Sequence, residues 1–308
     1  MPNRLEIFDK LRAKKQILSE IWPPVTEYTD SLNRKTGRNI IAYYSGFQHR
    51  SVQGYVDIND RDMNGFMTTV HGLDCTVGLD LVLHTPGGNP YATEALVSYL
   101  YSKFRNDIRV IVPQIAMSAG TMIALASKEI IMGRQSSLGP IDPQYKGWPC
   151  EGVLLEFEQA RRDILDNPQS AHLWRPILSQ YHPTFIGSCH RAIEHAKALA
   201  RNWLSRNMCY NETTKVVDES RINQILDTLA SHEQSKSHSR HFDIGACQEI
   251  GLDILSIEAV DEDISGFQDD VLSLHHCCDY ILSGFPLTKM IFNHQGNLYF
   301  EQVPKPAG

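Results

Sequence analysis

The sequence of 308 residues predicts one α/β domain with helices at its periphery. Runs rich in β-branched and other apolar residues at 39–44, 79–84 and 108–112 are typical of buried strands. The second and third runs are each followed by a short turn and then by residues with helical spacing. The composition, 42% hydrophobic and 21% charged, is ordinary for a folded chain. Together these features favour a domain built from strand–turn–helix units.

Charge and cysteine content narrow the class of protein. A formal net charge of −7 and a pI near 6.0 leave no concentrated basic stripe, so we expect no nucleic-acid partner. The cysteines are odd in number and scattered through the chain, which favours reduced thiols in a cytoplasmic compartment. They are Cys75, Cys150, Cys189, Cys209, Cys247, Cys277 and Cys278.

Residues 1–38 are predicted to form an N-terminal helical arm. Apolar residues recur at about helical spacing until Pro23 and Pro24 interrupt the pattern. Packing on its own domain and contact with a neighbouring subunit or a membrane surface both remain open for this amphipathic, basic segment. No signal-peptide core is visible, and no window reaches the roughly 20 apolar residues of a membrane span. We therefore expect a cytoplasmic protein without an integral membrane segment.

The first motif with chemical meaning is a pair of glycines after a buried strand. The strand 79–84 runs on to Pro86 and breaks into Gly87 and Gly88, and helical spacing follows over 91–104. Glycine has no Cβ and reaches positive φ, so its backbone N–H can approach a substrate carbonyl closely. Gly87 and Gly88 are therefore candidates for an oxyanion hole.

The second motif places a serine at a strand-to-helix turn. Ser118 lies between the strand 108–112 and an apolar segment rich in small residues, 119–126. The first N–H groups of a helix are unpaired, so an oxyanion formed at this turn is stabilised by geometry already in place. Ser118 is the candidate nucleophile, and Ala119 joins the glycines as a candidate oxyanion donor.

These motifs resemble a known family. HTPGG at 84–88, AMSAGTMIALASKEIIMG at 116–133 and SSLGPIDPQ at 136–144 are similar to the Clp-protease/crotonase superfamily, most closely to the serine dehydrogenase proteinases, relatives of signal peptide peptidase A. The resemblance implies a Clp-protease/crotonase-like spiral of βαβ units over 39–300, followed by a tail at 301–308. It also implies a homo-oligomer that hydrolyses peptide bonds of peptides or unfolded proteins through a serine acyl-enzyme.

The general base is the open question. Where caseinolytic proteases carry the histidine of their triad, this chain has Ile141, Asp142, Pro143 and Gln144, none of which is a histidine. A serine hydroxyl is a weak nucleophile unless a base removes its proton. The replacements weighed are His84, Lys146, His238 and His241. We favour His238, with Asp142 as the carboxylate that orients it, because the segment before EIGLDI approaches the site in the superfamily and histidine has a suitable pKa. Lys146 and His241 remain the alternatives.

Later segments are expected to complete the domain. Helices are predicted at 153–165, 185–208 and 218–232, and the resemblance implies that such helices form a lid and subunit contacts, although plain core packing is equally compatible. The sequence HHCC at 275–278 lacks the spacing of a zinc site, so no metal or other cofactor is expected, and it is interpreted as a strand. Residues from 287 onward are predicted to supply closing strands or a helix–strand pair.

Two functions from different classes therefore follow. The first is a serine peptidase with Ser118 as nucleophile. The second is a non-catalytic peptide- or acyl-binding scaffold that keeps the fold but lacks an efficient base. An enoyl-CoA hydratase-like activity is disfavoured, because it would require paired carboxylates where this chain places Ser118.

Overall fold

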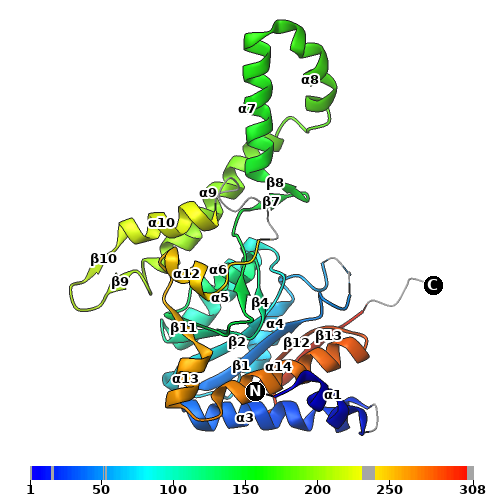
Figure 1. Cartoon of the computed structure of the whole chain (residues 1–308), viewed down its shortest axis with the longest axis vertical. Coiled ribbons are helices and arrows are strands. Elements are labelled where there is room, and N and C mark those ends of the chain that lie inside the picture. Colours follow the sequence, from blue (N-terminus) through cyan, green and yellow to red (C-terminus); the bar gives the residue numbers. More distant parts are fainter. Residues whose placement is uncertain (1, 15–16, 51, 53, 231–239, 304–308) are drawn as a thin grey trace.

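A seven-stranded mixed sheet forms the centre of the computed structural model, which describes residues 2–14, 17–50, 52, 54–230 and 240–303 (Figure 1). The strand order is β11-β5-β3-β2-β1-β12-β13, parallel from β11 to β1 and antiparallel from β1 to β13. The strands are β1 (Asn39–Ser45), β2 (Leu79–His84), β3 (Ile108–Val112), β5 (Glu129–Met132), β11 (Ile254–Ser256), β12 (Leu287–Asn293) and β13 (Leu298–Gln302). This mixed α/β architecture agrees with the expected Clp/crotonase-like fold.

Both faces of the sheet are covered, and the strands alternate between two cores as the pleat requires. Leu81 and Leu83 of β2 belong to one core, and Val82 between them belongs to the other. The first core lies under α4 (Asp62–Val70), α5 (Pro90–Phe104), α6 (Ala119–Leu125), α10 (Glu219–Leu229) and α12 (Ile244–Glu249). The second lies under α1 (Arg4–Arg12), α3 (Pro23–Thr36), α13 (Ile257–Asp263) and α14 (Phe267–Gly284).

A helical arm projects from this body (Figure 1). It consists of α7 (Cys150–Asp166), η2 (Pro168–Ser170), α8 (Ala171–Leu178) and α9 (Phe185–Leu204), with the hairpin β7 (Gln144–Tyr145) and β8 (Trp148–Pro149) at its base. A small core of its own ties α7 to α9 through Cys150, Val153, Phe185 and Cys189. No residue of α8 is buried. Short elements complete the chain: α2 (Leu18–Ile21), η1 (Cys75–Val77), β4 (Ile115–Ala116), β6 (Ser137–Leu138), β9 (Tyr210–Asn211) and β10 (Val216–Val217).

The N-terminal helices pack on their own domain. Ile7, Phe8 and Leu11 of α1 are buried in the second core, and the Phe8 ring meets the Tyr280 ring of α14 edge-on at 4.9 Å. Pro23 does not end the helical region, because it occupies the first turn of α3, where a missing N–H costs nothing. The division of the chain at residue 38 stays a prediction.

The interpretation of residues 275–278 as a strand is wrong. They lie in the middle of the 18-residue helix α14. Val271, Leu274, Cys278 and Ile281 are all buried, and this helical spacing becomes visible only when the flanking turns are included. Four residues alone cannot distinguish a buried helix from a buried strand.

A group of buried aromatic side chains joins α14 to the carboxyl ends of β1 and β2. The His84 ring lies 5.5 Å from the Tyr44 ring and 5.2 Å from the His275 ring. Burial lowers the pKa of His84 to about 4. Burial, reinforced by His84 and His276, lowers the pKa of His275 to about 3. Both imidazoles are therefore neutral in the folded protein near neutral pH.

Acid should destabilise the fold through these histidines. An unfolded histidine takes up a proton near pH 6.5, whereas the folded ones do so only near pH 4 and 3. The unfolded state thus binds more protons as the pH falls below 6.5, and the free energy of unfolding should fall by up to about 1.4 kcal/mol per pH unit for each histidine. Urea unfolding between pH 7.5 and 4.5 measures this slope. His275→Leu should flatten it, and the same change at the exposed His172 should not.

Candidate active site

Ser118 occupies a sharp turn between a strand and a helix. It is the residue before α6, and its backbone has φ 50° and ψ −115°. The Gly120 N–H donates to Met117 O at 2.7 Å and the Met122 N–H donates to Ser118 O at 3.0 Å, which holds the turn closed. A non-glycine residue at positive φ costs free energy and persists where the surroundings over-determine it. Such a strained strand-to-helix turn exposes the hydroxyl of a serine nucleophile.

Backbone pairing brings the glycine motif to this turn. Thr85, directly after β2, donates its N–H to Ile115 O at 3.1 Å and accepts the Met117 N–H at 3.1 Å. The third motif is tied to the same place, because Thr121 Oγ1 donates to Gly139 O at 2.9 Å. The three segments that were singled out in the sequence therefore lie side by side at the carboxyl ends of β2 and β3.

Gly87 approaches the serine too closely for any side chain. A Cβ on Gly87 would lie 2.7 Å from Ser118 Cβ and 2.6 Å from Met117 O, and φ at Gly87 is +101°. Gly88 is equally confined from the opposite side, because a Cβ there would lie 2.3 Å from Ile58 N. Both positions require glycine for the close approach and for the positive φ of the backbone, +101° at Gly87 and +154° at Gly88.

The three candidate oxyanion donors differ in whether their N–H groups already donate a hydrogen bond. The Gly87 N–H donates to Thr85 Oγ1 at 3.2 Å. Gly88 pairs with Ile58, whose N–H donates to Gly87 O at 2.8 Å and whose carbonyl accepts the Asn89 N–H at 2.9 Å. In an extended segment this pairing turns the N–H and C=O of Gly88 away from Ile58. Within the described part of the chain, neither the Gly88 N–H nor the Ala119 N–H donates a hydrogen bond.

A cavity of about 310 Å³ opens in front of Ser118. Its wall combines an apolar side with three polar side chains, those of Asp57, Ser118 and Gln144, and the glycine backbone. The lining residues are Asp57, Pro86, Gly88, Pro90, Ser118, Ala119, Met122, Ile141, Pro143, Gln144, Gly147 and Ala196. Sequence reasoning did not find Asp57 or Ala196, which come from a loop before α4 and from the arm helix α9. No spacing signal in the sequence connects either residue to Ser118.

The candidate bases occupy different places. Lys146 is exposed in the β7–β8 turn, with its Nζ 5.8 Å from the centre of the Tyr145 ring. His241 is exposed and its Nδ1 lies 2.7 Å from Ser137 Oγ. His84 faces α14, on the opposite side of the sheet from the cavity. His238 lies outside the described residues.

Asp142 is buried between two residues that line the cavity, Ile141 and Pro143. Among the described residues no group hydrogen-bonds to Ser118 Oγ. The residues on either side of 231–239 are held near the serine turn. Leu229 O accepts the Ile141 N–H at 2.8 Å, and Phe242 pairs with Leu138 through bonds of 2.8 and 3.0 Å. Leu138 in turn pairs with Ala116, two residues before Ser118.

Cysteines are poor rivals for the role of nucleophile. All seven are free thiols, and only Cys75 is not fully buried. Burial, assisted by Cys189, raises the pKa of Cys150 to about 12, and burial raises the pKa of Cys247 to about 12 as well. A thiol with such a pKa supplies almost no thiolate at neutral pH. Across residues 2–303 as far as the structure describes them, no group of three or more His, Cys, Asp or Glu side chains is arranged to hold a metal ion.

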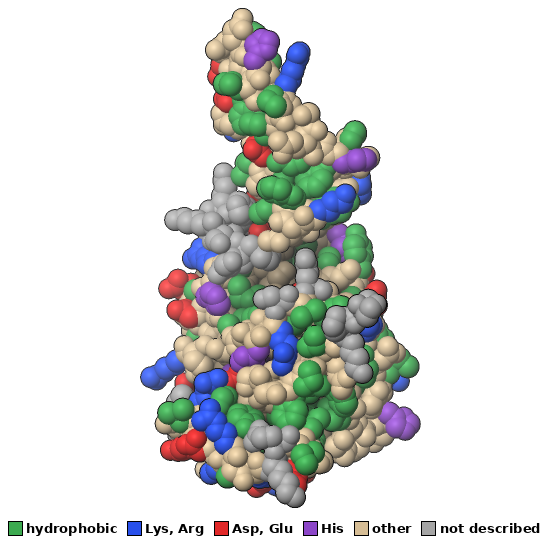
Figure 2. Space-filling model, turned by 90° about the vertical axis from the view of Figure 1, so that its right-hand side faces the viewer, with side chains coloured by type: hydrophobic (Ala, Val, Ile, Leu, Met, Phe, Trp, Pro, Cys, Tyr) green, Lys and Arg blue, Asp and Glu red, His purple; other side chains and the backbone are tan. Residues whose placement is uncertain are grey.

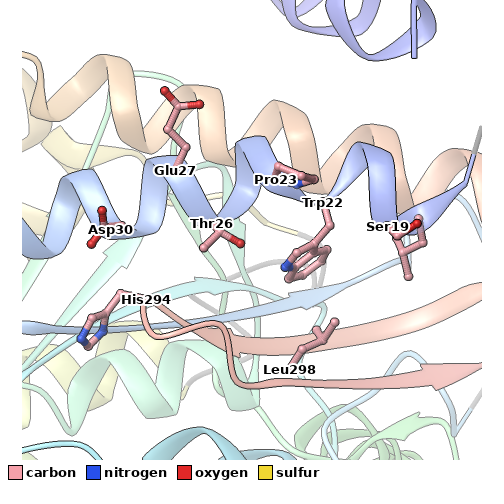
Figure 3. A pocket seen from close by; sticks show the side chains of 9 residues that line it. Ser19, Trp22, Pro23, Thr26, Glu27, Asp30, His294 and Leu298 are labelled. Atoms are coloured by element: carbon pink, nitrogen blue, oxygen red, sulfur yellow. The ribbon is translucent and has the colours of Figure 1, made fainter. Parts of the chain in front are cut away.

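A larger hollow lies on the other face of the sheet. It has a volume of about 720 Å³ and runs between α2, α3 and the turn that joins β12 to β13 (Figure 3). Trp22, Pro23 and Leu298 supply its apolar floor, with Glu27, Asp30 and His294 around it. The Trp22 ring meets Phe292 edge-on at 5.0 Å, so it is anchored in the second core. This hollow contains no group related to the Ser118 chemistry.

The sheet, the strained serine turn and the paired glycines meet at the carboxyl ends of β2 and β3. Residues 46–170 match the family of ClpP-like SDH-type serine proteinases, which confirms over this segment the resemblance noted in the sequence. An uncharacterized protein of Methanocaldococcus jannaschii is 42% identical over 89 residues, 29% of this chain and 31% of its own length. A second uncharacterized protein of that organism is 30% identical over 138 residues, 44% of this chain and 47% of its own length. The chain thus spans less than half the length of these relatives.

No helix among the described residues is long and apolar enough to cross a membrane. The longest helix of this part of the chain, α9, carries charged residues along its 20-residue length, as a helix at a water-exposed surface does.

Gly87→Ala should lower the hydrolytic activity of the site far more than it lowers the stability of the fold. Its methyl group must displace Ser118 or Met117, because a Cβ at position 87 has only 2.6–2.7 Å to the nearest atoms of these two residues. Loss of one oxyanion donor or a comparable displacement typically costs about 3 kcal/mol in transition-state stabilisation. Hydrolysis of an unfolded protein substrate measures the effect. Gly296→Ala is the control, since Gly296 has φ +87° and open space around it; equal activity in the two variants would contradict the geometry.

Proposed function

We propose that this protein is a serine peptidase that cleaves peptide bonds through an acyl-enzyme on Ser118. The observation that carries the proposal is the strained Ser118 turn packed against Gly87, at a cavity lined by Gly88 and Ala119, whose N–H groups donate to no described residue. The match of residues 46–170 to a serine proteinase family supports the same reaction class. The substrate class is a peptide or an unfolded protein.

The proposed reaction begins with attack of Ser118 Oγ on the scissile carbonyl carbon. The hydroxyl proton passes to a general base, and the carbonyl oxygen becomes an oxyanion that the N–H groups of Gly88 and Ala119 stabilise. Collapse of this intermediate breaks the C–N bond, and the base returns the proton to the leaving amine. A water molecule, deprotonated by the same base, then hydrolyses the ester on Ser118.

Gly88 also supports a peptide as the substrate. Its N–H and C=O face away from Ile58, so an extended peptide can add to the Ile58–Gly88 pair as a further strand. The apolar wall formed by Met122, Ile141 and Ala196 would take an uncharged side chain next to the scissile bond. The geometry thus offers both backbone pairing and a side-chain pocket.

For the base we propose His238, oriented by Asp142. The support comes from two described residues on either side of 231–239: Leu229 is bonded to Ile141 and Phe242 to Leu138, so both lie near the serine turn. Asp142 lies at the cavity with only 2% of its surface exposed. Lys146 and His241 are the alternative bases. Lys146 is the weaker of these candidates, because its side chain is exposed beside the Tyr145 ring in the β7–β8 turn.

The second candidate function is a non-catalytic peptide- or acyl-binding scaffold. The observation in its favour is that no described residue hydrogen-bonds to Ser118 Oγ. The same cavity and the same Gly88 edge would then bind a peptide without cleaving it. Covalent labelling of Ser118 distinguishes the two functions.

We also propose a homo-oligomer in which the arm contributes to subunit contacts. Leu165 and Leu173 are 68% and 73% exposed, and Figure 2 shows hydrophobic side chains on the surface of the projecting arm. Exposed apolar surface of this kind marks a protein contact site.

The free state of all seven cysteines supports a cytoplasmic location for the assembly, because reduced thiols are typical of that compartment.

Ser118→Ala should abolish labelling by a fluorophosphonate probe and peptide hydrolysis together. The substitution removes the hydroxyl that forms the covalent bond and alters little of the packing, so thermal unfolding should stay nearly unchanged. Ser102→Ala, at an exposed position of α5, is the matched control and should retain full labelling. Unlabelled but folded wild-type protein would favour the scaffold instead.

Removal of the true base should lower kcat about as much as removal of the serine, because the two act as a unit. We expect this loss for His238→Ala, and near-wild-type kcat for His241→Ala and Lys146→Ala. Activity of the wild type should rise with pH through an ionisation near about 6.5, the ordinary value for histidine. A dead Lys146→Ala variant beside an active His238→Ala variant would assign a Ser–Lys dyad.

A further inference from the structure

A fully buried lysine lies in the sheet on the same face as the active-site cavity. Lys289 is in the middle of β12, 0% exposed, and its neighbour Ile291 two residues on belongs to the core under α4 and α5. Lys289 Nζ donates to Asp62 Oδ1 at 2.5 Å, and Asp62, in the first turn of α4, is also 0% exposed. Buried charges of this kind cost desolvation free energy that a simple hydrocarbon contact would not.

The side chains of Lys289 and Asp62 form hydrogen bonds to the backbone of one loop, residues 57–59. Lys289 Nζ also donates to the backbone carbonyl of Asp57 at 3.1 Å. Asp62 Oδ2 accepts the backbone N–H of Asn59 at 2.9 Å and, from a side chain, the Tyr43 hydroxyl at 3.1 Å. The ion pair therefore binds the backbone on both sides of Ile58.

Ile58 is the residue that holds the glycine segment. Its N–H donates to Gly87 O at 2.8 Å and its carbonyl accepts the Asn89 N–H at 2.9 Å. The position of Gly88 between these two bonds fixes the direction of its own N–H. A continuous set of hydrogen bonds thus runs from Lys289 and Asp62 through residues 57–59 to the segment beside Ser118.

We propose that Lys289 and Asp62 are positioning residues, which hold residues 57–59 so that the Gly88 N–H stays aimed at the oxyanion formed at Ser118. This inference rests on the proposed peptidase function. A donor that must meet an oxyanion tolerates little displacement, because misplacement of about 1 Å can cost about a hundredfold in rate. Neither residue touches the substrate.

This role can be separated from a contribution to stability. Replacement of a whole buried ion pair by apolar residues of similar volume is often neutral for stability, whereas removal of one partner alone is destabilising. The double variant Lys289→Met/Asp62→Leu should therefore remain folded while it loses every bond to the backbone of residues 57 and 59. Glu301, whose carboxylate lies 3.6 Å from Lys289 Nζ, keeps Arg61 at 3.2 Å as a partner in this variant.

The experiment compares this double variant with the wild type in steady-state hydrolysis and in hydrogen exchange followed by mass spectrometry. We expect kcat to fall at least about tenfold with KM little changed, an unchanged thermal unfolding temperature, and faster amide exchange confined to peptides that cover 57–59 and 85–89. A folded double variant with wild-type kcat and wild-type exchange in those peptides would overturn the proposal.

The control is the double variant Asp80→Leu/Arg109→Met. Arg109 Nη2 lies 2.6 Å from the buried Asp80 carboxylate at the amino ends of β2 and β3, the ends remote from Ser118. The kcat of this control variant should stay within about twofold of wild type. If Lys289→Met/Asp62→Leu fails to fold, Asp62→Asn replaces it, with a smaller loss of kcat and the same exchange pattern expected, and unchanged values of both would overturn the proposal.

The exchange measurement separates this proposal from the peptidase function. Absence of hydrolysis and of fluorophosphonate labelling in the wild type would refute the peptidase function on its own. Faster exchange at 85–89 in the double variant would still support the positioning role of Lys289 and Asp62 for the glycine segment.

Discussion

The close approach of Gly87 to Ser118 is the constraint on which the rest of the site depends. A Cβ on the glycine would stand 2.7 Å from the serine Cβ, so the glycine motif and the serine turn can meet only where one of them lacks a side chain. That contact places at one cavity the N–H groups of Gly88 and Ala119, which donate to no other described residue. Next to this contact, the pairing of Thr85 with Ile115 and Met117 fixes the backbone before the serine. This pairing explains why the turn can hold Ser118 at positive φ.

The two faces of the sheet carry different polar chemistry at the same strand ends. Residue 84 points to α14 and joins a group of buried neutral histidines, whereas the backbone four residues later forms the wall of the Ser118 cavity. Ligand sites in open α/β sheets lie beyond the carboxyl ends of the strands, and the Ser118 cavity obeys that rule. The alternation of side chains along β2 is what keeps the histidines out of the serine chemistry.

Buried charge supports the site from below. The fold retains a buried ion pair at Lys289 and Asp62, and its hydrogen bonds to the backbone go to the loop that carries Ile58. Charges retained at a desolvation cost usually serve specificity of structure. Here the structure that they specify is the alignment of one loop with the glycine segment.

Much of the fold could be predicted from local patterns in the sequence. The strands predicted at 39–44, 79–84 and 108–112 and the turn at Ser118 follow from β-branched runs, small residues and Gly-Pro punctuation, because these act through the backbone of a few neighbouring residues. Residues 275–278 were misassigned for the same reason, since four residues carry no period and the helical spacing appears only when the flanking turns are included. The helix end expected at Pro23 failed for a similar reason. A proline can follow one helix or begin the next, and here it begins α3.

The composition of the site could be predicted only in part. Ser118, Gly88 and Ala119 lie within the motifs that the sequence analysis identified, so the sequence determined that they would be presented at strand ends. Only the tertiary structure decided that Gly87 gives its N–H to Thr85, that Asp57 and Ala196 line the cavity, and that Lys289 supports the loop before α4. These relations join residues that are as many as 232 positions apart in the chain, and such contacts arise from packing, which leaves no periodic signal in the sequence.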